Sequence, residues 1–364
     1  MGGVTMQAAV LHAAGDLRVE EVPQPEPREG EALVRIRANG LCGSDIHFYE
    51  AGRLGPFVVD RPYIPGHEAV GVVEAIGRDA GAGSAAHGAP ASRPAPGTRV
   101  AIEPGIPCRR CSHCKHGRYN LCTSVRFLSA PPENGTFAEY ATLAADFCHV
   151  VPDALSDEEA ALVEPVSVGV HACNRAAVRP GEPFAVVGAG PIGLITMLVG
   201  YAYGAGPATV VDIAANRRAK AIELGAAHAV DGSKGDEAVA EVMELTQGEG
   251  VPYVFDTSGA SAGCAFAPRI TRRGGVVTLV GWPELSAFPF PIEEVIEKEL
   301  DIRGINRYCN TYPTALRLME SRKLDVRPLI SHRFGFNEVV HAFEFASAHR
   351  DQTIKVLVGQ AGRS

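Results

Sequence analysis

The sequence predicts an α/β protein with two architectures, a β-rich N-terminal domain and a doubly wound parallel sheet in the second half of the chain. Residues 6–40 alternate apolar and polar side chains around several prolines, as short antiparallel strands do. From residue 184 onward, short apolar runs of strand length alternate with longer segments of helical periodicity. A chain of 364 residues is long enough for both domains.

The composition indicates a protein that acts on small molecules. The chain is 46% hydrophobic with a net charge of −8, so it has no basic surface field to hold nucleic acid or anionic lipid. Its first residues contain neither a basic region nor an apolar run of signal-peptide or membrane-spanning length. The nine cysteines are odd in number and clustered, unlike a secreted disulfide framework. We therefore expect a cytoplasmic protein without nucleic-acid or membrane partners.

Strands and turn-rich segments alternate in the N-terminal half. Residues 69–76 predict a strand in which Gly71 marks a bulge or a close backbone approach. Residues 79–96 are mainly Gly, Ala, Ser and Pro, a composition that cannot bury enough surface to fold, so we expect a flexible surface loop. Residues 136–143 return to a strand, and Ser156 with three acidic residues after it marks the start of helical structure.

Two short stretches of this half carry metal-ligating side chains. Cys42 lies in G-L-C-G-S-D-I-H, and His67 with Glu68 lies in P-G-H-E. Zn²⁺ accepts these sulfur, nitrogen and oxygen donors, and three protein ligands on two Gly-bounded loops leave a fourth position open for water or substrate. Ser44 and His47 follow the cysteine closely, so a hydroxyl and an imidazole can relay a proton from a reacting alcohol to solvent. Each residue alone is ordinary, but the joint pattern favours a catalytic zinc site.

A second cluster, C-x2-C-x2-C-x7-C, is formed by Cys108, Cys111, Cys114 and Cys122. Four thiolates on one tight loop make a closed tetrahedral site, which indicates a structural zinc holding a lobe with little core of its own. An iron–sulfur cluster is the alternative. We therefore expect two zinc ions per chain, one catalytic and one structural.

The motif G-x-G-x-x-G, formed by Gly188, Gly190 and Gly193, directly follows the apolar run 184–187. An apolar helix to about Tyr203 comes after it, so the motif has the strand-turn-helix context that a dinucleotide site requires. Glycines let the backbone approach a pyrophosphate, and the helix N-terminus supplies partial positive charge. The sequence therefore predicts a dinucleotide-binding turn.

Asp212 ends the next predicted strand, at 208–211, about twenty residues beyond the glycines. A carboxylate there accepts from the adenosine ribose hydroxyls and repels a 2′-phosphate, which predicts NAD. Arg217 and Arg218 are close enough in sequence to favour a phosphate if Asp212 pointed away.

The alternation of helices and strands continues toward the C-terminus. Expected helices cover 216–224, 236–246, 262–270, 311–321 and 339–346, and expected strands cover 227–230, 253–256, 276–280 and 300–305. We therefore divide the chain into a catalytic domain with its zinc-binding lobe at 1–158, a dinucleotide-binding domain at 159–300, and a return to the catalytic domain at 301–364. The active site is expected in the cleft between the domains.

These stretches, with L-V-E-P-V-S-V-G-V-H-A around Glu164 and R-Y-C-N-T-Y-P at Arg307 to Pro313, resemble the zinc-dependent medium-chain dehydrogenases, and among them the polyol (sorbitol, xylitol and arabinitol) dehydrogenases. The resemblance runs from about Ala8 to Val356. It implies a GroES-like catalytic domain, a Rossmann cofactor domain, and Zn²⁺ and NAD as cofactors. The implied reaction is oxidation of a secondary alcohol of a sugar alcohol to a ketose, in a homo-oligomer that is a dimer or a tetramer.

The resemblance also implies roles for individual residues. Cys42, His67 and Glu68 match the catalytic zinc ligands, and Glu164 matches an acid that holds the metal-bound water or exchanges onto the metal. Ser44 and His47 fall on the proton-relay positions. The implied substrate pocket contains Tyr49, Phe127, Glu164, Arg307 and Tyr308. The implied cofactor contacts are Ile192, Asp212, Arg217, Val280, Gly281, Trp282, Ile305, Asn306 and Arg307. Without the resemblance, Tyr49 and Phe127 are interpreted as packing residues.

Two other functions stay open from the sequence. A threonine or general secondary-alcohol dehydrogenase has the same scaffold, and Arg307 argues against small apolar alcohols more strongly than against threonine. A non-catalytic nucleotide-binding or redox-sensing protein is expected to have lost a zinc ligand, and Cys42, His67 and Glu68 are all kept. The four-cysteine lobe does not discriminate among substrates, because some polyol dehydrogenases lack it.

Overall fold

The computed structural model describes residues 3–77, 94–283 and 287–360. The chain divides into two compact units, the first formed by Met1–Glu164 and Leu329–Ser364 and the second by Pro165–Pro328. Most of the loop predicted at 79–96 lies outside the described residues.

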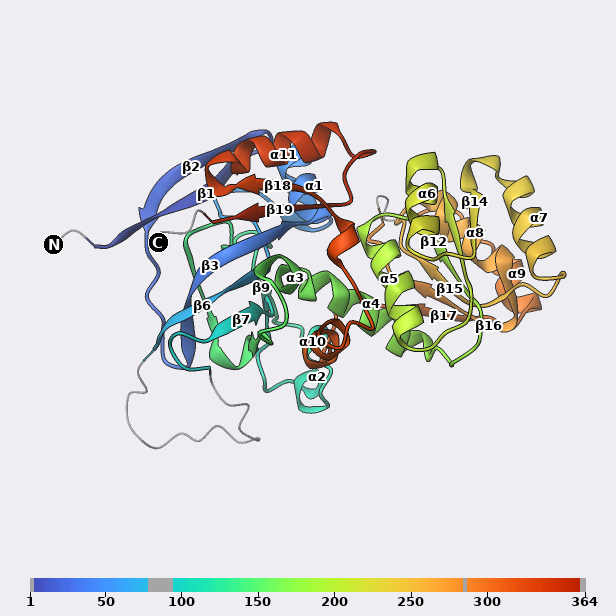
Figure 1. Ribbon diagram of the computed structural model, residues 1–364, viewed down its shortest axis with the longest axis horizontal. Helices are drawn as coiled ribbons and strands as arrows, with labels where there is room; N and C mark the ends of the chain where they lie inside the picture. Colours follow the sequence, from blue (N-terminus) through green and yellow to red (C-terminus); the bar gives the residue numbers. More distant parts are fainter. Residues whose placement is uncertain (1–2, 78–93, 284–286, 361–364) are drawn as a thin grey trace. The chain divides into compact units, whose positions relative to one another are not determined.

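The first unit is built on a seven-stranded sheet with the order β11-β7-β6-β3-β19-β18, in which β10 also pairs with β3. All pairs are antiparallel except β18 with β19. The strands are β3 (Glu31–Leu41), β6 (Glu68–Ile76), β7 (Arg99–Ile102), β10 (Tyr140–Ala144), β11 (Cys148–Val150), β18 (Ile330–Gly335) and β19 (Lys355–Gly359). The sheet thus places the C-terminal strand β19 directly beside β3 (Figure 1).

Short hairpins and helices complete the first unit. The hairpins pair β1 (Thr5–Ala13) with β2 (Asp16–Pro23), β4 (Arg53–Leu54) with β5 (Phe57–Val58), and β8 (Gly105–Ile106) with β9 (Arg126–Phe127). The helices are α1 (Gly43–Ala51), α2 (Ser112–Lys115), α3 (Asp157–Ala161) and α11 (Val339–Ala348). Helices α1 and α11 share one hydrophobic core with β1, and this core includes Phe48, Phe137 and Phe343.

The second unit is a six-stranded parallel sheet with the order β14-β13-β12-β15-β16-β17. Its strands are β12 (Phe184–Val187), β13 (Ala208–Asp212), β14 (His228–Asp231), β15 (Val251–Asp256), β16 (Thr271–Leu279) and β17 (Asp301–Gly304). This 3-2-1-4-5-6 order is that of the doubly wound fold, so the predicted α/β class is confirmed. Strands β12, β13 and β15 are buried along their whole length, which explains their continuous apolar runs.

The second unit contains α5 (Pro191–Ala202), α6 (Ala215–Glu223), α7 (Asp236–Leu245), α8 (Ser261–Ile270), α9 (Ile292–Glu297), α10 (Tyr312–Glu320) and most of α4 (Val163–Ala176), which begins two residues before the boundary between the units. Helix α8 contacts both α7 and α9 on one side of the parallel sheet (Figure 1). Helix α5 packs on β12 and β15, and α6 packs on β13 and β14.

The unit boundaries differ from the predicted domain boundaries of 158/159 and 300/301. Strand β17 pairs in parallel with β16 and extends the sheet of the second unit, so residues 301–328 belong with that sheet instead of returning to the first unit. Helix α3 ends at Ala161 and stays in the first unit. The predicted boundary at 300/301 differs from the boundary between the compact units because the residues of β17 do not show which sheet the strand joins.

Local predictions hold at several positions. Ser156 and Glu159 form a capping box, since the Ser156 side chain accepts from the Glu159 amide and the Glu159 carboxylate accepts from the Ser156 amide. A Cβ on Gly71 would lie 2.4 Å from the carbonyl oxygen of Arg35, which confirms a close backbone approach. The stretch after Cys42, in contrast, forms the helix α1 instead of the loop that its flanking glycines predict.

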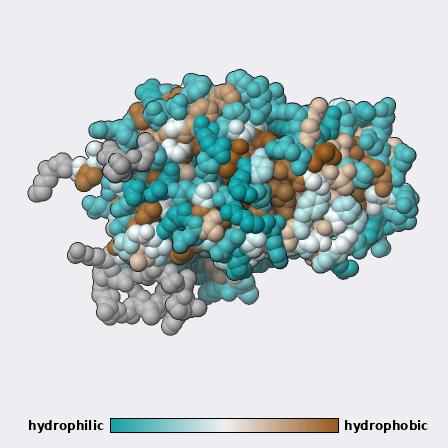
Figure 2. Space-filling model, viewed as in Figure 1, coloured by the Kyte–Doolittle hydropathy of each residue, from teal (hydrophilic) through white to brown (hydrophobic). Residues whose placement is uncertain are grey.

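Within the described ranges, no helix combines the length and apolar character needed to cross a membrane. On the face shown in Figure 2, apolar residues are interrupted by hydrophilic ones.

Candidate active site

Cys42, His67 and Glu68 come together at one end of the first unit's sheet. Cys42 precedes α1, and Glu68 is the first residue of β6. One ligand atom from each residue lies within 4.8 Å of the others, and His67 and Glu68 are buried. Three such donors at this separation fit a zinc ion with an open position, so the residues present suit the metal that the sequence predicts.

Asp45 supports this cluster from behind, and the sequence interpretation did not single it out. Its buried carboxylate accepts from the Cys42 and Gly66 amides, both at 3.1 Å, and from the Ser129 hydroxyl at 2.8 Å. Its Oδ1 lies 3.7 Å from Nδ1 of His67. This separation is longer than a hydrogen bond, so the carboxylate acts on the imidazole through its charge. Asp45 belongs to the quoted motif, but only the fold shows that it faces His67.

The electrostatics of this pair are governed by burial and by mutual attraction. Burial alone would raise the pKa of Asp45, but the charge of His67 and the hydrogen bonds to Asp45 lower it below its usual value. Burial alone would lower the pKa of His67, but the negative charges of Asp45 and Cys42 raise it well above its usual value. A metal ion at this site therefore competes with a proton on His67.

Lys355 is a second residue of the cluster that the sequence interpretation missed. Its Nζ lies 2.7 Å from both carboxylate oxygens of Glu68. Burial alone would lower the pKa of Lys355, but the negative charges of Glu68 and Cys42 raise it, and Glu164 acts in the same direction. No local signal marks this lysine, because it lies 287 residues beyond Glu68 in the chain.

The other predicted catalytic and substrate residues of the first unit have different surroundings. The Phe127 ring lies 5.5 Å from the His67 ring, so the structure brings Phe127 to the cluster. Glu164 is buried in the first turn of α4. Tyr49 packs edge-on against Phe343 at 5.7 Å, which is the packing position expected without the family resemblance.

Ser44 and His47 both lie on α1, within five residues of Cys42. Their separation of three residues places them on the same face of the helix. The helix begins directly after the metal ligand Cys42, so this face starts at the metal cluster.

In the second unit, the glycine-rich turn has the geometry that its motif predicts. Gly188 has a φ of 96°, in the left-handed region that favours glycine. A Cβ on Gly193 would lie 1.8 Å from the Gly188 carbonyl oxygen, so only glycine permits this contact between turn and helix. Gly190 caps α5 and Pro191 is its first residue. The turn therefore presents a helix N-terminus that suits a pyrophosphate.

Asp212 points toward this turn. Its carboxylate accepts from the Ala189 amide at 2.6 Å and from the Ala214 amide at 2.7 Å. A carboxylate has roughly four acceptor positions, so two contacts leave capacity for ribose hydroxyls. The Arg218 guanidinium donates to the Asp212 and Ile213 carbonyl oxygens and to the Asp231 carboxylate. Arg218 is thus engaged locally, while Arg217 lies beside it on α6.

The remaining predicted cofactor residues follow other strands of the same parallel sheet. Val280 comes directly after β16 and Ile305 directly after β17. Because parallel strands have their carboxyl ends at one edge, these segments share an edge with Gly188 and Asp212. The segments at this edge contain the predicted residues Ile192, Val280, Gly281, Trp282, Ile305, Asn306 and Arg307. A Cβ on Gly281 would lie 2.3 Å from the Gly259 amide nitrogen, which explains why glycine is needed there.

Comparison with known proteins agrees with the fold of both units. Residues 28–153 match the alcohol dehydrogenase GroES-like domain, and residues 191–321 match the zinc-binding dehydrogenase domain. The sorbitol dehydrogenase of Bacillus subtilis (strain 168) is 38% identical over 353 residues, covering 97% of each chain. The chain belongs to the zinc-dependent medium-chain dehydrogenases.

Solved structures of this family have the same fold. An Escherichia coli oxidoreductase/dehydrogenase of unknown specificity superposes on this dehydrogenase with a TM-score of 0.89, at 32% identity, over 99% of this chain and 100% of the other. The 2R,3R-butanediol dehydrogenase of Bacillus subtilis superposes with a TM-score of 0.85, at 30% identity, over 97% and 99% of the two chains.

The dehydrogenase's second metal-ligating cluster is formed locally. One ligand atom from each of Cys108, Cys111, Cys114 and Cys122 lies within 4.8 Å of the others. Backbone amides of Arg110 and Cys111 donate to Cys108 and lower its pKa to about 6. Burial and neighbouring thiols raise the pKa of Cys114 to about 12. Four thiols at this spacing fit a closed zinc site, which accepts all four as thiolates.

Side chains outside the four cysteines attach this lobe to the main sheet of the dehydrogenase. The Tyr119 hydroxyl donates to the buried Glu103 at 2.6 Å, and Nε2 of His149 lies 2.7 Å from the same carboxylate. Arg109 makes two 2.6 Å hydrogen bonds to Asp146.

Arg307 and Tyr308, the predicted substrate residues of the second unit, have distinct environments. Arg307 has a φ of 54°, a left-handed conformation that is uncommon for a residue with a side chain. Tyr308 is 3% exposed, and its ring lies 5.6 Å from that of Tyr312. Tyr308 therefore packs within its own unit and is almost completely buried.

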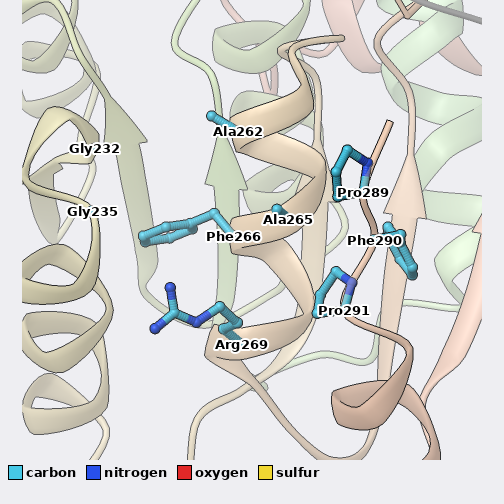
Figure 3. A pocket seen from close by; sticks show the side chains of 9 residues that line it. All are labelled: Gly232, Gly235, Ala262, Ala265, Phe266, Arg269, Pro289, Phe290 and Pro291. Carbon is cyan, nitrogen blue, oxygen red and sulfur yellow. The ribbon is translucent and has the colours of Figure 1, made fainter. Parts of the chain in front are cut away.

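A pocket of about 360 Å³ lies elsewhere in the second unit, beside α8. Figure 3 shows Phe266 and Arg269 extending from α8 on one side and Phe290 lying on the other. Arg269 is paired with Asp236 at 2.8 Å, and the rest of the lining is mostly apolar. This pocket holds none of the predicted site residues.

Proposed function

We propose that this dehydrogenase oxidises a secondary hydroxyl of a sugar alcohol to a ketose, with transfer of hydride to NAD⁺. The observation that carries the proposal is the intact cluster of Cys42, His67 and Glu68, with its ligand atoms within 4.8 Å of one another. When bound there, Zn²⁺ acts as a Lewis acid that makes the substrate hydroxyl more acidic. Similarity to sorbitol dehydrogenase supports a polyol as the substrate.

The residues around the cluster have different roles in the proposed reaction. Asp45 stabilises His67 through its negative charge, because its carboxylate lies 3.7 Å from the ring nitrogen. Glu164, buried in the first turn of α4, would hold a water beside a bound metal or would itself serve as a ligand. Ser44 and His47 move the hydroxyl proton along α1 toward solvent. Cys42 and Glu68 supply two negative charges that offset those of a divalent ion.

NAD⁺ is proposed over NADP⁺ because Asp212 turns its carboxylate toward the glycine turn. A 2′-phosphate placed beside this carboxylate meets a like charge, whereas ribose hydroxyls can donate to it. The Asp212→Ser variant should lose most of the preference for NAD⁺. An unchanged ratio of kcat/KM for the two cofactors would contradict the assignment.

For substrate contacts we propose Phe127 and Glu164 near the metal ligands, together with Arg307 and its neighbour Tyr308. Of the predicted substrate residues, Tyr49 has the least support as a substrate contact, because its ring packs against Phe343. A guanidinium with five donors in a fixed fork can hold polyol oxygens that a simple alcohol lacks.

A simple secondary alcohol or diol is the second candidate substrate. Similarity to 2R,3R-butanediol dehydrogenase, at 30% identity, favours it. Threonine is a third substrate that the same scaffold permits.

Self-association as a dimer or tetramer is also proposed, in the cytoplasm. Strand β17 forms one edge of the second unit's sheet. Ile302 of β17 is 37% exposed, and Ile292 and Ile296 of α9, the helix that precedes β17 in the chain, are 57% and 72% exposed. An edge strand with exposed apolar side chains is a surface that proteins usually cover. All nine cysteines are free, which suits a reducing compartment.

The test is a substrate panel of sorbitol, xylitol, galactitol, threonine and 2-propanol, followed by the near-ultraviolet absorbance of NADH. The wild type should turn over at least one polyol better than 2-propanol or threonine. Arg307→Ala should lower kcat/KM for that polyol by roughly tenfold to a hundredfold, from a lost contact of about 1.5–3 kcal/mol, with little change in NAD⁺ affinity. Preference for 2-propanol, or a loss confined to NAD⁺ binding, would instead support a general secondary-alcohol dehydrogenase.

A further inference from the structure

Glu68 and Lys355 form a buried ion pair at the predicted metal centre. The Lys355 side chain is 3% exposed and that of Glu68 is fully buried. The ammonium donates to both carboxylate oxygens at 2.7 Å and lies 3.4 Å from the Leu41 carbonyl oxygen. An ammonium has three donors, so these contacts account for all of them.

The sheet confines this carboxylate on two sides. Glu68 of β6 lies opposite Gly40 of β3, and a Cβ on Gly40 would lie 2.0 Å from Glu68 Oε2. On the other side of β3, β19 places Lys355 next to Val356, which pairs with Leu41. The Glu68 carboxylate is therefore held between the backbone of β3 and the Lys355 ammonium, within 4.8 Å of the Cys42 and His67 ligand atoms.

Fold stability alone gives little reason for this pair. Two well-packed apolar side chains usually stabilise a core as well as a buried ion pair does, because desolvation offsets the attraction. A carboxylate required as a metal ligand is different, since without metal it would be a buried charge with no partner. A lysine supplies a compact positive charge that can remain when a divalent cation arrives.

We propose that Lys355 is a positioning residue for the metal centre, which holds Glu68 in place when metal is absent and competes with Zn²⁺ for its carboxylate. The competition weakens zinc binding relative to an unopposed carboxylate and keeps the ion exchangeable. This inference rests on the proposed metal site at Cys42, His67 and Glu68.

The test compares wild type with Lys355→Met, which keeps the chain length and removes the charge. Zinc affinity of the centre is measured by chelator competition, with Cys42→Ser reporting the zinc of the cysteine lobe alone. Lys355→Met should bind zinc about tenfold or more tightly, the scale on which outer partners of a metal change affinity. Its metal-free Tm should fall by roughly 5 °C or more, and its zinc-loaded Tm should fall by less.

Lys355→Arg is the matched control, because it keeps a positive charge beside Glu68. It should retain wild-type zinc affinity to within about threefold. If Lys355→Met does not fold, the double variant Lys355→Met/Glu68→Gln tests the inference instead. This variant removes both charges of the pair, so it should fold without metal. Failure of this double variant to fold would overturn the inference.

Two further outcomes would also overturn it. Equal falls in the metal-free and zinc-loaded Tm, with unchanged zinc affinity, would show a purely structural pair. Weaker zinc binding in Lys355→Met would show that the lysine assists the metal instead of competing with it. Failure of the proposed function has a separate signature, in which wild type and Cys42→Ser contain the same amount of zinc.

Discussion

The two metal centres of the first unit are built in different ways. The cysteine lobe takes all four ligands from Cys108–Cys122, and backbone amides within the same loop hold the sulfur of Cys108. The other centre draws on Cys42, on His67 with Glu68, and on Lys355 at the far end of the chain. A local site depends on a loop closing on itself, whereas a distributed site depends on the order and register of the sheet.

This difference has consequences for what each centre can do. A closed four-thiolate site leaves no position for substrate, so it contributes to folding. The three-ligand centre has buried charged partners on two sides, Asp45 behind His67 and Lys355 beside Glu68. Such partners tune a metal's affinity and its exchange with other ligands, which is a requirement of catalysis.

The largest expected effect separates the two centres by activity. Cys42→Ser should lower kcat/KM by roughly a thousandfold, because loss of Lewis-acid catalysis removes several kcal/mol of transition-state stabilisation. The lobe zinc should remain. The measurement is steady-state kinetics with the best polyol, together with metal analysis. Retention of wild-type activity would end the assignment of this centre as catalytic.

The matching change in the lobe should act on stability. Cys111→Ser should remove one zinc per chain and lower the free energy of unfolding by roughly several kcal/mol, since structural zinc contributes folding energy directly. Metal analysis measures the number of zinc ions per chain, and chemical denaturation measures the free energy of unfolding. Cys173→Ala, at a buried cysteine outside both clusters, is the control and should keep two zinc ions.

Removing the charge of Asp45, which lies behind the ligand His67, should have a smaller effect than removing a ligand. Asp45→Asn keeps the shape of the side chain and removes its charge, so zinc affinity at the catalytic centre should fall by roughly tenfold to a hundredfold. Chelator titration measures it. Asp146→Asn, which removes the partner of Arg109 at the lobe, is the control and should leave this affinity unchanged. Equal affinities in wild type and Asp45→Asn would indicate that Asp45 acts only in packing.

The smallest expected effect concerns the attachment of the lobe. Glu103→Gln weakens the contacts with Tyr119 and His149, and should lower the free energy of unfolding by about 1–3 kcal/mol. Urea denaturation measures the loss, and kcat/KM should stay within about twofold of wild type. Tyr119→Phe isolates one of the two contacts and should give part of the loss. A larger effect on activity than on stability would show that the centres are coupled.

The sequence alone determined the features that depend on neighbouring residues. The spacing of four cysteines predicted a cluster that the structure brings together. The run 184–187 followed by three glycines predicted a strand and a tight turn, and both occur because a buried parallel strand is apolar throughout and the turn needs a φ of 96° at Gly188. The α/β class followed from the alternation of such runs.

Only the tertiary structure decided which distant residues meet. Lys355 gave no signal, because a single lysine in an apolar strand becomes a partner of Glu68 only when β19 lies beside β3. The assignment of residues 301–328 to the second unit likewise depended on β17 pairing with β16. Periodicity within a segment shows whether it is a strand, but hydrogen bonds between strands join residues that are far apart in sequence, so partners and register are fixed only when the sheet assembles.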